Sequence, residues 1–295
     1  MKFWQTLTWV ETDQITRVAE IAEEVGFHGV LMSDHALVPR QMKSRYPYSE
    51  DGKPSFSAVS EYPDIWVLLG AIAAGTQRLR LSTSVFVLPL RNPIEVAKSA
   101  ASLAIVSQGR FSLGVGVGWG EDQYDAFGVE FSSRGRRADE GIEVMRKLWS
   151  TPRHSDWVEH QGEFFSFPPL RQCPVPRAPI PIWVGGHSRA ARRRAARLGD
   201  GFIGSGNAPE EVAPLLEEIG ILRRECGRER EPFETVIGLT TPPDLDTFRR
   251  LEACGMTSGV SYPLRYALGE RSSIDEKRRV MEAFAESIIL PMRGG

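Results

Sequence analysis

The chain has 295 residues, of which 41% are hydrophobic and 25% are charged. This length fits two ordinary domains or one large one, such as an α/β barrel of about 250 residues, and the apolar content excludes wholesale disorder. The 36 basic and 38 acidic residues nearly balance, at a net charge of −2. That balance argues against binding to a nucleic acid or to a membrane surface.

The cysteines and the N-terminus exclude further classes of protein. Cys173, Cys226 and Cys254 are far apart and form no CxxC or Cys/His cluster, so we expect neither a disulfide framework nor a metal site. The first residues read as a strand rather than a signal peptide, and every apolar run is shorter than the ~18 residues of a membrane helix. We therefore expect a cytoplasmic protein.

Strand-like and helix-like segments alternate along the chain. Apolar, β-branched and aromatic runs predict strands at 2–9, 29–34, 78–88, 110–118, 180–186, 200–205, 234–241 and 257–263. Amphipathic segments predict helices at 12–25, 64–76, 94–106, 120–128, 133–149, 188–199, 209–226 and 244–255. The capping-box spacing of Ser273 and Glu276 predicts a last helix.

The alternation predicts an α/β fold with a parallel sheet, and two segments interrupt it. Residues 36–62 form a long loop that we expect to act as a lid, and residues 151–179 form an irregular, proline-rich excursion. Eight strand–helix units favour a (β/α)8 TIM barrel with insertions, as one domain over residues 1–295. A doubly wound sheet would need a Gly-rich fingerprint near the start, which the sequence lacks.

The active site of such a barrel lies at the carboxyl ends of its strands. The second predicted strand ends in Ser33-Asp34-His35. A carboxylate beside an imidazole can position a proton donor or acceptor, because imidazole titrates near neutral pH. The alternative is that Asp34 ties down the loop that follows while His35 is solvated.

The third and fourth predicted strands carry small residues. Ser82, Thr83 and Ser84 offer hydroxyl groups beside which a flat ligand fits, unless they reflect ordinary β-propensity. Gly114 and Gly116 alternate along the fourth strand and remove side chains from one face. This either opens room for a bulky ligand or lets the strands pack closely.

The fifth predicted strand runs through Gly185-Gly186-His187-Ser188 into a helix. Unpaired amides and the helix dipole favour an anion such as a phosphate there, whereas the alternative is a tight turn with Ser188 as N-cap. Three arginines on one face of that helix are expected to be solvated: Arg189, Arg193 and Arg197. Three other histidines are expected to be structural: His28, His154 and His160.

Five segments, in this order, carry a resemblance to a known family: GVLMSDH, RLRLSTSVFVLPLRNPIEVAKSAASLAIVSQGRFSLGVGVGWGEDQYDAFGV, RGRRADEGIEVMRKLW, GEFFSFPPL and IPIWVGGHSRAARRRAARLGDGFI. Over residues 1–205 the sequence resembles the bacterial luciferase-like monooxygenase superfamily, in particular its F420-dependent oxidoreductase branch. The last third matches only in its strand–helix rhythm.

The resemblance implies a barrel with insertions that binds a flavin or deazaflavin at its carboxyl-terminal face. It implies a non-prolyl cis peptide bond at Ser84–Val85 and a cofactor phosphate on the turn before the helix at 188–199. It gives Asp34 a contact with the deazaflavin and His35 the role of proton donor. The cofactor site that it implies comprises Asp34, Thr83, Ser84, Val85, Val117, Gly118, Trp119, Asp122, Gly185, Gly186, His187 and Ser188.

Two positions depart from the F420-dependent sugar-phosphate dehydrogenases that the sequence resembles. Those enzymes have a glutamate where this chain has Trp119, and a tryptophan where it has Pro39. This argues against a sugar-phosphate substrate.

The leading hypothesis is an oxidoreductase that uses F420 for hydride transfer to or from an unidentified small organic molecule. The alternatives are an FMN-dependent monooxygenase of the same superfamily, a non-catalytic flavin-binding barrel, and a sugar-phosphate barrel enzyme without flavin. By the resemblance we expect a homodimer.

Overall fold

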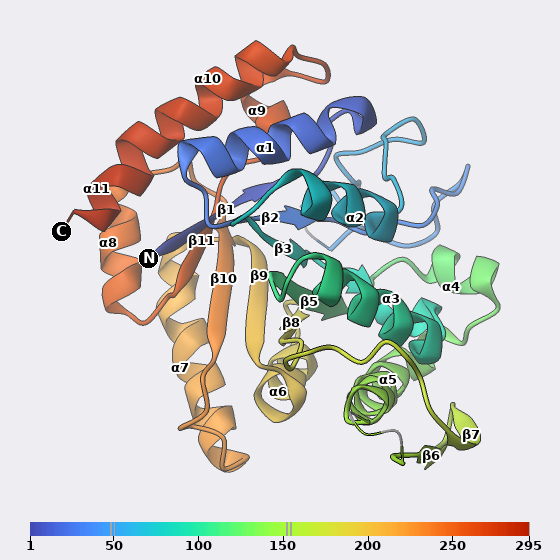
Figure 1. Cartoon of the computed structure of the whole chain (residues 1–295). Coiled ribbons are helices and arrows are strands. Elements are labelled where there is room, and N and C mark those ends of the chain that lie inside the picture. Colours follow the sequence, from blue (N-terminus) through green and yellow to red (C-terminus); the bar gives the residue numbers. More distant parts are fainter. Residues whose placement is uncertain (48, 50, 152, 154, 295) are drawn as a thin grey trace.

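The computed structural model describes residues 1–47, 49, 51–151, 153 and 155–294. Its main sheet is a closed barrel of parallel strands surrounded by helices (Figure 1), which confirms the predicted (β/α)8 fold. The strands follow chain order around the barrel, and β3 pairs with β5. Among the described residues the barrel strands are β1 (Lys2–Thr6), β2 (Gly29–Met32), β3 (Arg80–Thr83), β5 (Phe111–Gly116), β8 (Ile182–Gly185), β9 (Gly201–Asn207), β10 (Glu234–Leu239) and β11 (Ser258–Val260).

Helices cover the outside of the barrel (Figure 1), and α10 near the C-terminus packs against α1 near the N-terminus. The long helices are α1 (Ile15–Val25), α2 (Ile65–Gly75), α3 (Pro93–Val106), α5 (Arg134–Trp149), α6 (Arg189–Leu198), α7 (Pro209–Glu225), α8 (Leu245–Ala253) and α10 (Ile274–Phe284). Shorter ones are α4 (Glu121–Phe127), α9 (Leu264–Leu268) and α11 (Leu290–Arg293), with a π-helical turn at Ala285–Ile289 and 3-10 turns at Thr12–Gln14, Leu88–Leu90 and Phe131–Ser133. The sequence pattern does not predict α9.

Several helices begin or end at residues that cap their free backbone groups or adopt the backbone conformation of a helix end. The side chains of Asp64, Asn92 and Ser188 accept hydrogen bonds from first-turn amides of α2, α3 and α6. Ser273 begins α10 in the predicted capping box. Gly26, with φ of 97°, ends α1 in the left-handed conformation that glycine adopts without strain.

Hydrophobic side chains fill both faces of the barrel wall, because successive residues of a strand point to opposite faces. Along β8, Ile182 and Val184 belong to the core between strands and helices, whereas Trp183 belongs to a separate cluster inside the barrel. The residues of this inner cluster are Trp4, Leu31, Trp183, Ile203 and Val236, with Val85 and Val260 packed against them.

The third barrel strand contains one extra residue. Ser82 pairs with Ser112 and Phe86 pairs with Val115, so four steps along the third strand match three steps along β5. This β-bulge divides the predicted strand 78–88 into β3 and β4 (Phe86–Val87). The Ser84–Val85 peptide bond within it is cis, which confirms the expectation from the resemblance.

The excursion at 151–179 is more ordered than predicted. It contains an antiparallel hairpin of β6 (Val158–Gln161) and β7 (Ser166–Leu170). Glu140 of α5 holds this hairpin by accepting hydrogen bonds from the Phe164 and Phe165 amides, and it contacts the His160 ring at 3.1 Å. His160 is therefore structural, as predicted. His28 packs edge-on against Trp4, and His154 lies outside the described residues.

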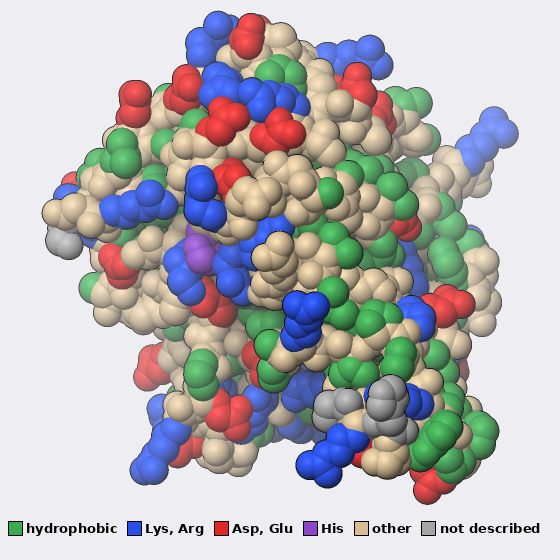
Figure 2. All heavy atoms as spheres, viewed as in Figure 1, with side chains coloured by type: hydrophobic (Ala, Val, Ile, Leu, Met, Phe, Trp, Pro, Cys, Tyr) green, Lys and Arg blue, Asp and Glu red, His purple; other side chains and the backbone are tan. Residues whose placement is uncertain are grey.

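Lys/Arg and Asp/Glu side chains are interspersed on the face seen in Figure 2, in keeping with the near-zero net charge. None of the helices in the described parts of the chain is both long and apolar enough to span a lipid bilayer.

Candidate active site at the carboxyl ends of the strands

Asp34, two residues after the end of β2, anchors the third strand. Its Oδ2 accepts a hydrogen bond from the Val87 amide at 2.9 Å, and its Oδ1 pairs with Arg91 Nη2 at 2.8 Å. Burial raises the pKa of Asp34, and the positive charge of Arg91 opposes that rise. Asp34 thus holds the segment after the bulge, rather than the loop that follows it in sequence.

His35 lies among aromatic rings. The ring centroids of Phe56 and Tyr62 are 4.7 and 5.1 Å from that of His35, and the Trp119 ring lies nearly parallel to it at 6.2 Å. Gln123 Nε2 is 3.1 Å from His35 Nδ1, and His35 Nε2 is buried with no hydrogen-bond partner among the described residues. Burial lowers the pKa of His35 to about 4, so the imidazole is neutral at pH 7.

An aromatic cover, which we define as Tyr46, Phe56, Tyr62 and Trp119, lies over His35. The centroids of Tyr46 and Trp119 are 5.0 Å apart, and those of Phe56 and Tyr62 are 5.5 Å apart. Loop 36–62 supplies every ring of this cover except Trp119, and its predicted action as a lid stays a prediction.

Asp122 fastens the loop to α4. Its carboxylate accepts hydrogen bonds from the amides of Lys43 and Ser44, both at 3.0 Å, and from the Ser44 hydroxyl at 2.7 Å. In return, Ser44 Oγ accepts the Glu121 amide at the start of α4. Asp122 therefore contacts the loop, and its predicted contact with a cofactor stays a prediction.

The glycines of β5 and β8 make room for the protein's own bulge. A Cβ atom added at Gly116 would lie 2.4 Å from Val85 Cγ2, and one at Gly185 would lie 2.6 Å from Val85 Cγ1. A Cβ at Gly114 would lie 1.9 Å from the Thr83 carbonyl oxygen. Close packing therefore accounts for these glycines, and Val85 fills the space that a direct ligand contact would have needed.

Hydrogen bonds hold the other residues of the bulge. The Thr83 hydroxyl is buried and donates to the Gly114 carbonyl at 2.6 Å. Ser33 Oγ donates to the Ser84 carbonyl at 3.3 Å and lies 2.6 Å from Thr8 Oγ1.

The segment after β5 is fixed in a similar way. Tyr124 of α4 donates its hydroxyl proton to the Val117 carbonyl. Gly118 has φ of 67°, and a Cβ there would lie 2.8 Å from Val87 Cγ1. Gly118 is therefore required by both the backbone conformation and the space.

The turn from β8 to α6 has both features that the sequence left open. Ser188 is the N-cap, and its Oγ accepts the Ala191 amide at 3.2 Å. The Arg189 and Ala190 amides, ahead of it in the first turn, have no intrahelical acceptor. The Arg192 guanidinium donates to the His187 carbonyl at 2.6 Å and pairs with Glu218 of α7 at 2.7 Å, so its charge beside this helix N-terminus is already balanced by a carboxylate. Arg189, Arg193 and Arg197 are exposed, as predicted.

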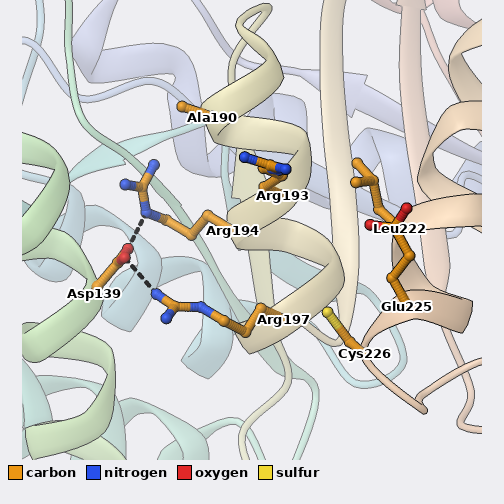
Figure 3. A pocket seen from close by; sticks show the side chains of 8 residues that line it. All are labelled: Asp139, Ala190, Arg193, Arg194, Arg197, Leu222, Glu225 and Cys226. Carbon is orange, nitrogen blue, oxygen red and sulfur yellow. Dashed lines mark hydrogen bonds and ion pairs between the residues drawn. The ribbon is translucent and has the colours of Figure 1, made fainter.

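A cavity of about 370 Å³ lies elsewhere, between α5, α6 and α7 (Figure 3). Arg194 and Arg197 of α6 both pair with Asp139 at its edge (Figure 3). The residues that line it are Asp139, Ala190, Arg193, Arg194, Arg197, Leu222, Glu225 and Cys226, none of which is a predicted site residue.

Comparison with known proteins decides the family. The sequence model of the luciferase-like monooxygenase family matches residues 5–246 of this chain. The chain belongs to this family. A Mycobacterium tuberculosis protein described as uncharacterized is 38% identical to this luciferase-like protein over 275 residues, covering 92% of this chain and 93% of the relative. An F420-dependent glucose-6-phosphate dehydrogenase of Nakamurella multipartita is 31% identical over 247 residues, covering 81% of this chain and 66% of the relative.

A solved structure supports the fold of this luciferase-like chain. The monooxygenase RslO1 from Streptomyces bottropensis superposes with a TM-score of 0.78 at 22% identity, covering 99% of this chain and 100% of the other. At that identity the likeness shows the barrel fold alone.

Sequence reasoning missed three parts of this luciferase-like site. Gln123 could have been predicted from the sequence, because it follows the glycines at the end of the fourth strand, where functional residues of a barrel lie. Arg91 had no signal that distinguishes it from the many other arginines of the chain. The sequence shows that loop 36–62 contains aromatic residues, but only the fold shows that their rings meet over His35.

Proposed function

We propose that this protein is an oxidoreductase that binds the deazaflavin F420 at the carboxyl ends of its strands and uses it for hydride transfer with a small organic substrate. The observation that carries the proposal is the buried His35 Nε2, which lacks a hydrogen-bond partner in the described parts of the chain. A buried polar atom left unpaired in such a site is a candidate for contact with a bound molecule.

The residues present fit such a cofactor in two further respects. Val85, half-buried on the bulge, gives a hydrocarbon surface of the kind on which a flat ring packs. The α6 N-terminus, with free first-turn amides and the positive end of the helix dipole, suits the phosphate of an anionic cofactor. Since the net charge of the chain is −2, these amides, rather than a general positive field, would hold the anion.

When bound, F420 would supply the hydride chemistry, and the protein supplies binding and orientation. Ser84 and Val85 would support the ring, and the turn from Gly185 to Ser188 would hold the phosphate. His35 would donate its Nε2 proton in a hydrogen bond to the reacting oxygen of the substrate. The aromatic cover would exclude water from the reacting atoms.

The F420-dependent relative, which is 31% identical over 247 residues, supports F420 over FMN. Trp119 stands where the sugar-phosphate dehydrogenases have a glutamate, so the substrate is proposed to differ from a sugar phosphate. With FMN, the same site would instead support an oxygen-dependent monooxygenase.

The test is a fluorescence titration of the purified protein with F420 and, separately, with FMN. We expect saturable binding of F420 and much weaker binding of FMN. Gly186→Val should weaken F420 binding, because Gly186 has φ of 135° and a Cβ would lie 2.9 Å from that of Ala191. Gly109→Val is the matched control, because Gly109 also has a positive φ but has open space and no place in the site.

Two outcomes would overturn the proposal. Tight FMN binding with oxygen uptake on turnover would show the monooxygenase instead. Unchanged turnover of any substrate in the His35→Ala variant would remove His35 from the reaction and favour a barrel that binds F420 without catalysis through this residue.

A further inference from the structure

Gln123 of α4 connects His35 to the first residue of loop 36–62. Its side chain is 4% exposed and has two contacts. Gln123 Oε1 accepts the Ala36 amide at 3.2 Å, and Gln123 Nε2 lies 3.1 Å from His35 Nδ1. Neither contact belongs to a helix or strand, so both come from the tertiary arrangement of α4 against the end of β2.

These contacts determine which ring nitrogen of His35 carries the proton. A backbone amide can only donate, so the Gln123 atom that faces Ala36 must be the oxygen. The other terminus of the side chain is then the NH2 group, which can only donate. His35 Nδ1 must therefore accept, and the proton of the neutral ring is on Nε2.

We propose that Gln123 is a positioning residue that holds His35 as the neutral Nε2–H tautomer. The site then takes a substrate whose reacting oxygen is uncharged, either a carbonyl or the corresponding hydroxyl. The rest of this substrate is flat and apolar. This inference rests on the proposed function. Protonation of His35 would bring an Nδ1–H group against the Gln123 NH2 group, so the contact also opposes the imidazolium form.

The surroundings of His35 indicate the apolar character of the substrate. Its ring contacts among the described residues are Phe56, Tyr62 and Trp119, none of which carries a charge. The cations of this region already have carboxylate partners: Arg91 pairs with Asp34 at 2.8 Å, and Lys43 lies 3.8 Å from Asp125. A charged substrate oxygen beside His35 would have to lose its hydration without gaining a counter-ion, which is costly.

The tautomer is measured by NMR on protein labelled with 15N-histidine, without any cofactor. We expect His35 of the wild type to show a protonated Nε2 and an unprotonated Nδ1 at pH 7.5. Gln123→Glu replaces the donor with an acceptor, so His35 should gain an Nδ1 proton and its pKa should rise by more than one pH unit. Gln108→Glu makes the same change at an exposed position and should leave the His35 signals unchanged.

A wild-type His35 protonated on Nδ1 would overturn the assignment, even if the variant fails to fold. So would a folded Gln123→Glu variant with unchanged His35 signals and pKa. A merely structural role for Gln123 predicts that second result, because it affects stability and not the tautomer. Failure to bind F420 would refute the proposed function but would leave the tautomer measurement intact.

The substrate class is tested with a matched pair of flat probes, acetophenone and benzoate, which differ in the charge on the oxygen. At pH 7.5 we expect acetophenone to shift the His35 Nε2 resonance in the wild type, and benzoate at the same concentration to leave it in place. Benzoate binding as tight as that of acetophenone, or a shift by neither probe, would overturn the assignment of the substrate.

Discussion

Substitution of Gly116 by alanine tests whether β5 is glycine-rich because Val85 needs the space. The added Cβ would lie 2.4 Å from Val85 Cγ2, well inside van der Waals contact. Overpacking of this kind costs about 1–3 kcal/mol of unfolding free energy. Val85→Ala removes two methyl groups from a half-buried position and should cost about 1 kcal/mol.

The two changes should compensate each other, since the valine methyl is what the new Cβ meets. In the double variant we expect a coupling of about 1–2 kcal/mol relative to the sum of the single changes. Urea unfolding followed by circular dichroism measures all three variants. Gly70→Ala is the control, because nothing lies within 4 Å of its Cβ position in α2, and it should stabilise the protein by about 0.5–1 kcal/mol. Costs that add to within about 0.5 kcal/mol would refute the reasoning.

Three further predictions concern the charged and titratable groups of the site. Burial lowers the pKa of His35 to about 4, so on acidification the unfolded chain binds a proton near pH 6.5 whereas the folded chain does not. The free energy of unfolding therefore falls as the pH drops from about 6.5 to about 4. In urea unfolding at pH 7.5 and 5.0, His35→Gln should reduce this loss by about 1–2 kcal/mol, and an unreduced loss would place the effect elsewhere. Arg91→Met leaves Asp34 buried without its counter-ion and should lower the unfolding free energy by about 3–5 kcal/mol. A second change, Asp34→Asn, should recover part of this loss, and strictly additive costs of the two changes would contradict the reasoning. Asp122→Ala should speed tryptic cleavage within loop 36–62 several-fold, and an unchanged rate would mean that other contacts hold the loop.

The fold was predictable because its signals are local and repeated. Each barrel strand is a short apolar run, and most are followed by an amphipathic or capped helix. An error of one or two residues at the end of one predicted element therefore does not change the predicted order of strands and helices. The hairpin of β6 and β7 was missed because Pro168 and Pro169 lie within β7, where proline normally indicates an irregular segment.

The candidate site was only partly predictable. The position of Asp34 and His35 followed from their place at the end of a strand, but their partners did not, because Arg91 and Gln123 are 57 and 88 residues away in the chain. The meaning of Gly116 was also ambiguous, since a missing side chain can serve a ligand or a neighbour. The position of Val85 in the fold decides between the two.

The bulge in the third strand has a consequence for the direction of every side chain beyond it. Leu79 and Leu81 face the outer helices, and strict alternation would turn Val85 the same way. The single extra residue inverts the alternation, so Val85 faces the barrel interior and Phe86 packs outward against Trp66. A regular strand of the same sequence, without the bulge, would instead place Phe86 at the mouth of the barrel and turn Val85 outward. The bulge, as much as the composition of this strand, therefore determines the surface on which a ligand would rest.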